Sequence, residues 1–219
     1  VPPLDKLGGN SWEAVKEKIK KSVREMAEEL AAIYSARQVL EGHSFSLPGG
    51  LYDEFCTGFE FEETPDQAKA IEDMEADLAD AKPMDRLICG DAGFGKTEVA
   101  IRAAFLAAME GKQVAVLVPT TILAEQHYKS MLGLLGGNGA ISDDLDSEIP
   151  YPLKPEQISL LLGSTPESEK QETREALANG SIKLVVGTHA LLEDPVVFAN
   201  LQLAVIDEQH RFGVDQRAI

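Results

Sequence analysis

The stretch 86–105, "RLICGDAGFGKTEVAIRAAF", joins a short apolar run, a glycine-rich segment and a run that favours a helix. Its centre follows the pattern G-x-x-x-x-G-K-[ST], with the fixed positions occupied by Gly90, Gly95, Lys96 and Thr97. This pattern forms a phosphate-binding loop when a strand precedes it and a helix follows it. The apolar "RLIC" favours a strand and "TEVAIRAAF" favours a helix, so the stretch predicts a nucleotide-binding α/β domain.

The chemistry of such a loop depends on its glycines and its lysine. Glycines let the backbone wrap a phosphate without side-chain clashes, and we expect the amides of 93–97, Gly93 included, to point inward at the start of a helix. Lys96 would bridge the β- and γ-phosphates of ATP, and the Thr97 hydroxyl would ligate Mg²⁺. An ordinary glycine-rich turn is the alternative, but it explains neither the flanking elements nor the acidic box downstream.

Outward from this loop, short β-branched runs alternate with helical segments. The runs "QVAVLVP", "ISLLLG", "IKLVVG" and "LAVID" are continuously apolar, which is typical of strands buried on both faces of a parallel sheet. The segments "TEVAIRAAFLAAMEG", "TILAEQHYKSMLG" and "PESEKQETREALANG" between them predict helices. The fold class is therefore a doubly wound α/β domain over 58–219. The stretch "GGNGAISDDLDSEIPYPLKPEQ" lacks periodicity and predicts a surface loop.

The last apolar run ends in an acidic box, "LAVIDEQH". Asp207 and Glu208 would lie at the carboxyl edge of the sheet, where open α/β folds bind ligands. Asp207 would hold Mg²⁺ through water, and Glu208 would polarise the attacking water. Gln209 and His210 would couple the site to something beyond it. Together with the phosphate loop, the box predicts hydrolysis of ATP with Mg²⁺ as the metal.

Residues 1–57 are predicted to be a linker and a long amphipathic helix. Apolar residues recur at three-to-four spacing from Trp12 to Tyr34, and the helix should end near Gly42 after roughly 45 Å. Such a stripe needs a surface to lie on, either the following domain or parts of a larger protein, and we expect Trp12 to pack beneath the helix. The segment "GHSFSLPGGLYDEF" is predicted to be a linker with a Pro-Gly-Gly turn.

The charge and the cysteine content indicate which partners and which cellular location to expect. The chain has a net charge of −17 and so lacks the overall basic footprint of most nucleic-acid binders. Acidic residues concentrate in 58–80, whereas 16–24 is basic, which indicates either partners segregated by region or solvated helix faces. Cys56 and Cys89 are expected to be buried free thiols. Without a membrane span or a signal peptide in view, we expect a cytoplasmic location.

Several further segments resemble motifs of superfamily-two helicases and translocases with a D-E-x-H box. They are "TPDQAKAI", "PTTILAEQH", "LLGS" and "GTHALL". The resemblance implies a RecA-like P-loop lobe in which Gln67 contacts adenine, with Phe59 or Phe61 stacking on the base. It also implies contacts to DNA phosphates through small hydroxyl side chains and main-chain amides, which an acidic chain can make; the positions are Thr120, Thr121, Gly163, Ser164, Thr188 and His189. His127, in the same motifs, is expected to be structural.

The resemblance is narrower over two parts of the chain. Residues 3–130 resemble the transcription-repair coupling factor (Mfd) family, and 160–219 resemble the RecG family. Mfd members read D-E-E-Q-R-F-G at the box where this chain reads D-E-Q-H-R-F-G, so the choice between the families stays open. Both imply an ATP-driven translocase on double-stranded DNA, a second RecA-like lobe that this C-terminally truncated chain lacks, and, for Mfd, RNA polymerase as a partner. A non-catalytic docking module and a P-loop ATPase acting on RNA or protein are the alternatives.

Overall fold

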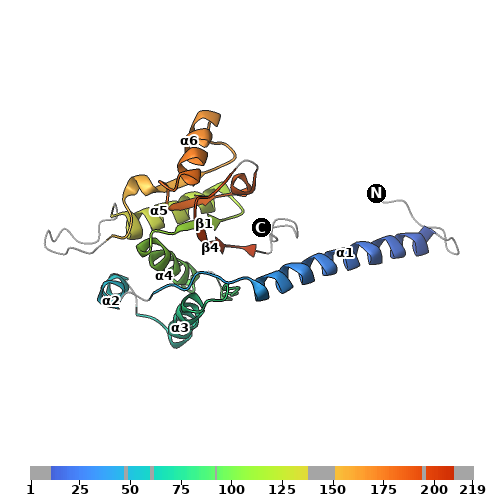
Figure 1. The fold of residues 1–219 in the computed structure, drawn as a ribbon, viewed down its shortest axis with the longest axis horizontal. Helices are drawn as coiled ribbons and strands as arrows, with labels where there is room; N and C mark the ends of the chain where they lie inside the picture. Colours follow the sequence, from blue (N-terminus) through green and yellow to red (C-terminus); the bar gives the residue numbers. More distant parts are fainter. Residues whose placement is uncertain are drawn as a thin grey trace.

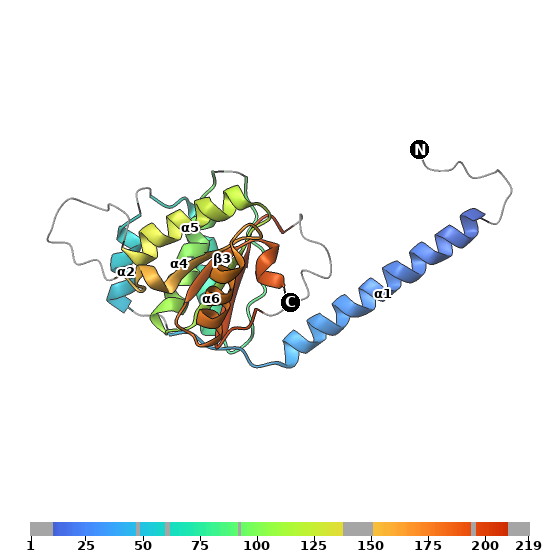
Figure 2. The same cartoon turned by 90° about the horizontal axis from the view of Figure 1, so that it is seen from above.

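A long helix and one packed α/β domain make up the computed structural model, which describes residues 11–46, 49–59, 62–91, 93–137, 151–193 and 196–209. Helix α1 (Ser11–Val39) confirms the helix expected at the start of the chain. It extends away from the domain (Figures 1 and 2), and its apolar stripe is exposed. Trp12 is 61% exposed, so the expectation that it packs beneath the helix is wrong for the described part of the chain, in which α1 extends away from the domain.

The domain is built on a parallel sheet of four strands in the order β2-β3-β1-β4. The strands are β1 (Gln113–Leu117), β2 (Ile158–Leu161), β3 (Leu184–Gly187) and β4 (Leu201–Ile206). β1, β2 and β3 each lie within a run that the sequence predicts to be a strand, whereas β4 begins two residues before the predicted run "LAVID". Helices α4 (Lys96–Met109) and α5 (Thr121–Gly136) cover one face, and α6 (Glu167–Ala178) covers the other (Figure 1).

Alternating side chains of the strands divide between two apolar clusters. On β1, Val114 and Val116 point to the α4 and α5 face, whereas Leu117 packs with Leu177 of α6. Burial on both faces is what continuous apolar runs predict, and β1, β2 and β3 confirm it. Strand β4 does not, since only Leu203 of its residues is buried. The predicted α/β class with a parallel sheet is confirmed.

The strand predicted for "RLIC" is absent from the described residues, where 83–91 has no regular secondary structure. Arg86 donates hydrogen bonds to Asp77 and Asp73 of helix α3 (Pro65–Ala79), and Leu87 is 71% exposed. A strand needs neighbouring backbone groups as hydrogen-bond partners. The ion pairs hold this segment beside α3, so its apolar composition was not sufficient to make it a strand.

The linker predicted from "GHSFSLPGGLYDEF" is also wrong in part. Helix α2 (Gly49–Thr57) begins within it and buries Tyr52 and Phe55. The Phe55 ring stacks on Phe105 of α4 with ring centroids 4.1 Å apart, and Phe45 is buried in the same core. The packed domain therefore begins near Phe45 and includes residues that composition assigned to a connector.

The structure describes only part of the predicted loop, and it describes both cysteines. Residues 138–150 of the predicted loop lie outside the described ranges, while Leu153 beyond them is buried ahead of the short helix η1 (Pro155–Gln157). Cys56 and Cys89 are free, as expected, but Cys89 is exposed and Cys56 only half-buried. Within the described parts of the chain, no helix is long and apolar enough to span a bilayer.

Candidate functional site

The glycine-rich segment forms a loop that leads directly into α4. Gly95 is the N-cap of α4 with φ of 72°, and Gly93 has φ of 83°. Both lie in the left-handed region, where a side chain costs roughly 1–2 kcal/mol. The spacing of these glycines in the sequence thus corresponds to two positions where the backbone requires them.

The loop engages its own lysine. The Lys96 ammonium donates to the carbonyl oxygens of Gly90 at 2.6 Å and Asp91 at 2.9 Å. The Phe94 amide donates to the Asp91 carbonyl at 3.3 Å, so this one amide points into the loop's own turn. Lys96 is therefore held across the loop by neutral carbonyls, which an anionic phosphate would replace favourably because charge-assisted hydrogen bonds are the stronger ones.

Gln67, predicted to contact adenine, lies against this loop. Its Oε1 accepts from the Thr64 amide at 2.8 Å, and its own backbone amide donates to Thr64 Oγ1, so that the two bonds form a capping box at the start of α3. Its Nε2 donates to the Phe94 carbonyl at 3.0 Å. A Cβ placed on Gly95 would lie 2.3 Å from that Nε2. The structure thus brings Gln67 and the phosphate loop together.

Of the two aromatic candidates, Phe61 lies outside the described residues. Phe59 packs edge-on against Phe55, and the Arg102 guanidinium carbon lies 4.7 Å from its ring centroid. One face of Phe59 is therefore occupied by a cation–π contact.

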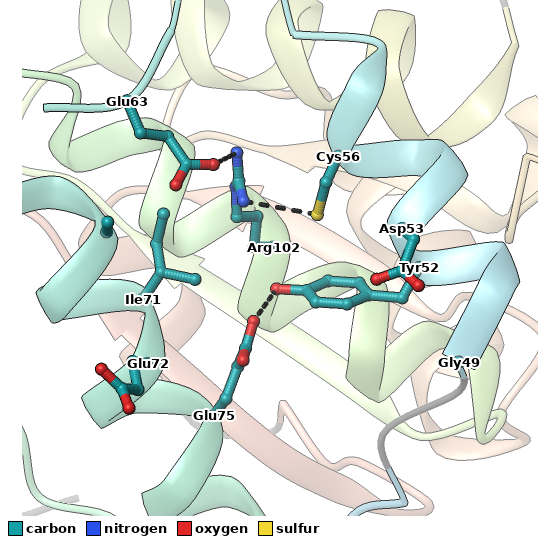
Figure 3. Close-up of a pocket in the computed structure, with 10 residues that line it drawn as sticks. Gly49, Tyr52, Asp53, Cys56, Glu63, Ile71, Glu72, Glu75 and Arg102 are labelled. Carbon is teal, nitrogen blue, oxygen red and sulfur yellow. Dashed lines mark hydrogen bonds and ion pairs between the residues drawn. The ribbon is translucent and has the colours of Figure 1, made fainter.

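Arg102 of α4 joins the segment around Gln67 to the phosphate-loop helix. Its guanidinium pairs with Glu63, just before the capping box, and donates to the Cys56 sulfur (Figure 3). It also pairs with Glu98, in the first turn of α4. Burial opposes its charge, but Cys56, Glu98 and Glu63 raise the pKa of Arg102 above its usual value. The ion pairs fix these elements relative to one another.

A cavity of about 400 Å³ lies beside Arg102, between α2, α3 and α4. Figure 3 shows the residues that line it. The Tyr52 hydroxyl donates to Glu75 across it at 2.6 Å. Burial, followed by the hydrogen bond to Glu75, raises the pKa of Tyr52 well above its usual value, so this phenol stays protonated. Of the described residues, none that the sequence predicts as a site residue lines this cavity.

The acidic box follows β4 directly. The Asp207 amide donates to the Leu117 carbonyl at 2.9 Å, which extends the pairing with β1 by one residue. One carboxylate oxygen of Asp207 accepts from the Glu208 amide and the other contacts His127 Nε2, both at 2.9 Å. Glu208 has φ of 51°, a left-handed backbone that residues other than glycine adopt rarely and often at functional sites. Gln209 is exposed, and His210 lies outside the described residues.

Mg²⁺ prefers oxygen ligands, and it is usually held by one or two carboxylates plus waters and phosphates. The Thr97 hydroxyl and the Asp207 carboxylate are donors of this kind. Each Asp207 oxygen accepts one protein hydrogen bond and keeps a further lone pair. These residues therefore fit the ion that the sequence predicts.

The predicted DNA-contact positions fall into two groups. Thr120 caps α5 and, like Thr121, is exposed. A Cβ on Gly163 would lie 3.5 Å from the His189 ring, so those two residues come together, with Ser164 exposed beside them. Thr188 differs, because it is only 2% exposed and its hydroxyl is buried with no hydrogen-bond partner in the described ranges. Thr188 therefore offers DNA no side-chain atom in this conformation.

The two thiols should differ in reactivity. Burial raises the pKa of Cys56, which lowers its thiolate fraction at neutral pH, whereas Cys89 is exposed immediately before Gly90. At pH 7 we expect a maleimide to label Cys89 first. Peptide mass spectrometry after partial labelling measures this, with Cys89→Ser as control; preferential labelling of Cys56 would contradict it.

The sequence analysis did not predict the contacts that Arg102 and His127 make at the site. Arg102 had one usable signal, since it is the lone charge within "AIRAAFLAAM" and stands four residues after Glu98. His127 had none beyond its place in a motif, because its partner is 80 residues away. Contacts of that separation become visible only in the folded chain.

A parallel sheet, a glycine-rich loop that opens a helix, and an acidic pair after a strand of that sheet together define a P-loop nucleotide-binding domain. The chain belongs to the DEAD/DEAH box helicase family, whose model matches residues 64–219. The fold is thus the RecA-like one that the motifs implied, and the similarity to a solved RecG structure confirms it.

Known proteins of two kinds are similar to this chain. It is 48% identical over 214 residues to the transcription-repair-coupling factor of Myxococcus xanthus, and 43% identical over 214 residues to that of Staphylococcus aureus. These matches span 98% of the chain but 16% and 17% of those relatives. The structure of RecG bound to a three-way DNA junction matches with a TM-score of 0.68 and 36% identity over 86% of this chain and 24% of that one. Both resemblances are confirmed, and the first extends well beyond 3–130.

Proposed function

We propose that this chain is the ATP-binding motor lobe of an ATP-dependent double-stranded DNA translocase that acts in transcription-coupled repair or at stalled replication forks. The observation that supports this most is the phosphate loop, in which Gln67 and Lys96 converge on the same turn of backbone. Membership of the helicase family and the similarity to transcription-repair-coupling factors and RecG support the choice of DNA as the track.

In this proposal each residue has a separate task. Lys96 exchanges the carbonyls of Gly90 and Asp91 for oxygens of the β- and γ-phosphates. Thr97 and Asp207 hold Mg²⁺, which neutralises charge on the phosphates when bound. Glu208 polarises the attacking water from its constrained backbone position.

Gln67 links recognition of the base to the loop. Its amide joins the start of α3 to the Phe94 carbonyl, and Arg102 holds the preceding segment against α4. A contact between Gln67 and adenine would therefore act directly on the phosphate loop, through the hydrogen bond to the Phe94 carbonyl. Phe61 remains the stacking candidate, since Phe59 already packs against Arg102.

Contacts to DNA are assigned to the exposed residues Thr120, Thr121, Gly163 and Ser164, with the His189 ring beside Gly163. A second RecA-like lobe would close the nucleotide site, with Gln209 and His210 transmitting the nucleotide state to it. Helix α1 would connect this lobe to a module that binds RNA polymerase. Because the second lobe would complete the catalytic site, the chain alone should hydrolyse ATP slowly, with no stimulation by DNA.

Titration with fluorescent methylanthraniloyl-ATP in the presence of Mg²⁺ tests the nucleotide site. We expect Lys96→Ala to weaken binding at least about tenfold, since a hydrogen bond to a charged group contributes about 1.5–3 kcal/mol. Lys112→Ala, a basic residue near the far end of α4, is the matched control and should bind as the wild type does. Equal binding by the wild type and Lys96→Ala would instead favour a docking module with a vestigial site.

A further inference from the structure

We propose that His127 is a positioning residue for Asp207, the carboxylate assigned above to Mg²⁺. The inference rests on the proposed function, because it gives His127 a role only if Asp207 handles the metal. His127 lies on α5 and Asp207 follows β4, and the His127 Nε2 lies 2.9 Å from Asp207 Oδ2. The folded chain thus supplies Asp207 with a partner from a different element.

The surroundings of the imidazole favour one protonation pattern. The His127 side chain is 11% exposed, and its Nδ1 is buried with no hydrogen-bond partner among the residues that the structure describes. A buried N–H without a partner is rarer than a buried acceptor without one. The proton of the neutral ring therefore belongs on Nε2, which donates to Asp207 and leaves Nδ1 as an unprotonated acceptor.

The contact fixes the direction of the Asp207 carboxylate. Oδ2 accepts from His127 on one side, while Oδ1 accepts from the Glu208 amide on the other. With one bond on each oxygen, the carboxylate plane cannot rotate freely, and the remaining lone pairs keep a set direction. Ligands held in this way bind metal more tightly, and removal of such a partner typically costs 10- to 100-fold in metal affinity.

Because His127 lies on α5, its contact with Asp207 also connects this carboxylate to the residues that are assigned to DNA. The helix begins at Thr121, preceded by its cap Thr120, and both are assigned to DNA. His127 follows Thr121 by six residues, about 9 Å along the helix axis. Asp207 Oδ2 is therefore held by the same helix whose N-terminus is assigned to DNA, whereas Oδ1 is held by the Glu208 amide, next to Asp207 in the chain.

Two substitutions separate the hydrogen bond from packing. In His127→Gln the amide nitrogen can take the place of Nε2, whereas in His127→Asn the shorter side chain can replace only Nδ1. The readout is the Mg²⁺ concentration that gives half-maximal binding of methylanthraniloyl-ATP to the full chain, with binding in EDTA measured alongside. We expect His127→Asn to raise that concentration about tenfold, His127→Gln to stay within about twofold of the wild type, and binding in EDTA to be the same for all.

The outcomes distinguish this inference from the proposed function. A wild-type chain that binds no nucleotide at any Mg²⁺ concentration would overturn the proposed function. Mg²⁺-dependent binding that is unchanged in His127→Asn, or equally weakened in both variants, would overturn the role of His127 alone. Thermal unfolding of each variant establishes that it is folded.

A measurement on the wild type does not depend on any variant folding. Long-range ¹H–¹⁵N spectra report which imidazole nitrogen of His127 carries the proton. We expect the proton on Nε2. A ring protonated only on Nδ1 could not donate to Asp207 and would overturn the inference.

Discussion

Replacement of Phe105 with alanine is expected to lower the free energy of unfolding by about 4 kcal/mol. The Phe105 side chain is 0% exposed at the centre of α4. Its ring stacks on Phe55 at 4.1 Å and lies 5.8 Å from Tyr52, both of α2. The substitution therefore leaves a cavity and also removes the aromatic surface on which α2 packs. Urea denaturation followed by circular dichroism measures the loss.

Val197→Ala is the control for Phe105→Ala. Val197 is 59% exposed, so its truncation should change the free energy of unfolding by no more than about 0.5 kcal/mol. A loss below about 1 kcal/mol for Phe105→Ala would mean that α2 does not belong to the core. In that case the domain would begin after α2, as the sequence analysis placed it.

The elements that the sequence predicted best are those whose evidence is local. Helix α4 and strand β1 follow from the residue pattern over a single stretch each. The loop glycines are predictable for the same reason, since their spacing reflects a backbone requirement at the position itself.

What the sequence could not provide depends on partners far along the chain. "RLIC" has the composition of a strand but pairs through Arg86 with α3, and the "linker" became α2 because Phe55 meets a ring fifty residues later. The contact between His127 and Asp207 is of the same kind. The local sequence sets which secondary structures a segment favours, and tertiary contacts with distant residues select the one that forms.

Gly95→Ala is expected to weaken methylanthraniloyl-ATP binding about hundredfold, which corresponds to roughly 2–3 kcal/mol. The φ of 72° at Gly95 costs an alanine about 1–2 kcal/mol. In addition, the new Cβ would lie 2.3 Å from Gln67 Nε2, so the amide must move and lose its hydrogen bond to Phe94, worth about 1 kcal/mol. Both penalties fall on the loop that holds the phosphates.

Gly111→Ala separates the effect of backbone strain from the effect of the contact between the phosphate loop and Gln67. Gly111 has φ of 67°, but a Cβ there meets no atom within 4 Å, and it lies beyond the far end of α4. It should lose about 1–2 kcal/mol of stability from the backbone alone and bind nucleotide as the wild type does. Since the strain is matched, any binding defect specific to Gly95→Ala arises from the loop and from Gln67. Normal binding by Gly95→Ala would mean that the contact between Gln67 and the loop has no part in holding the nucleotide.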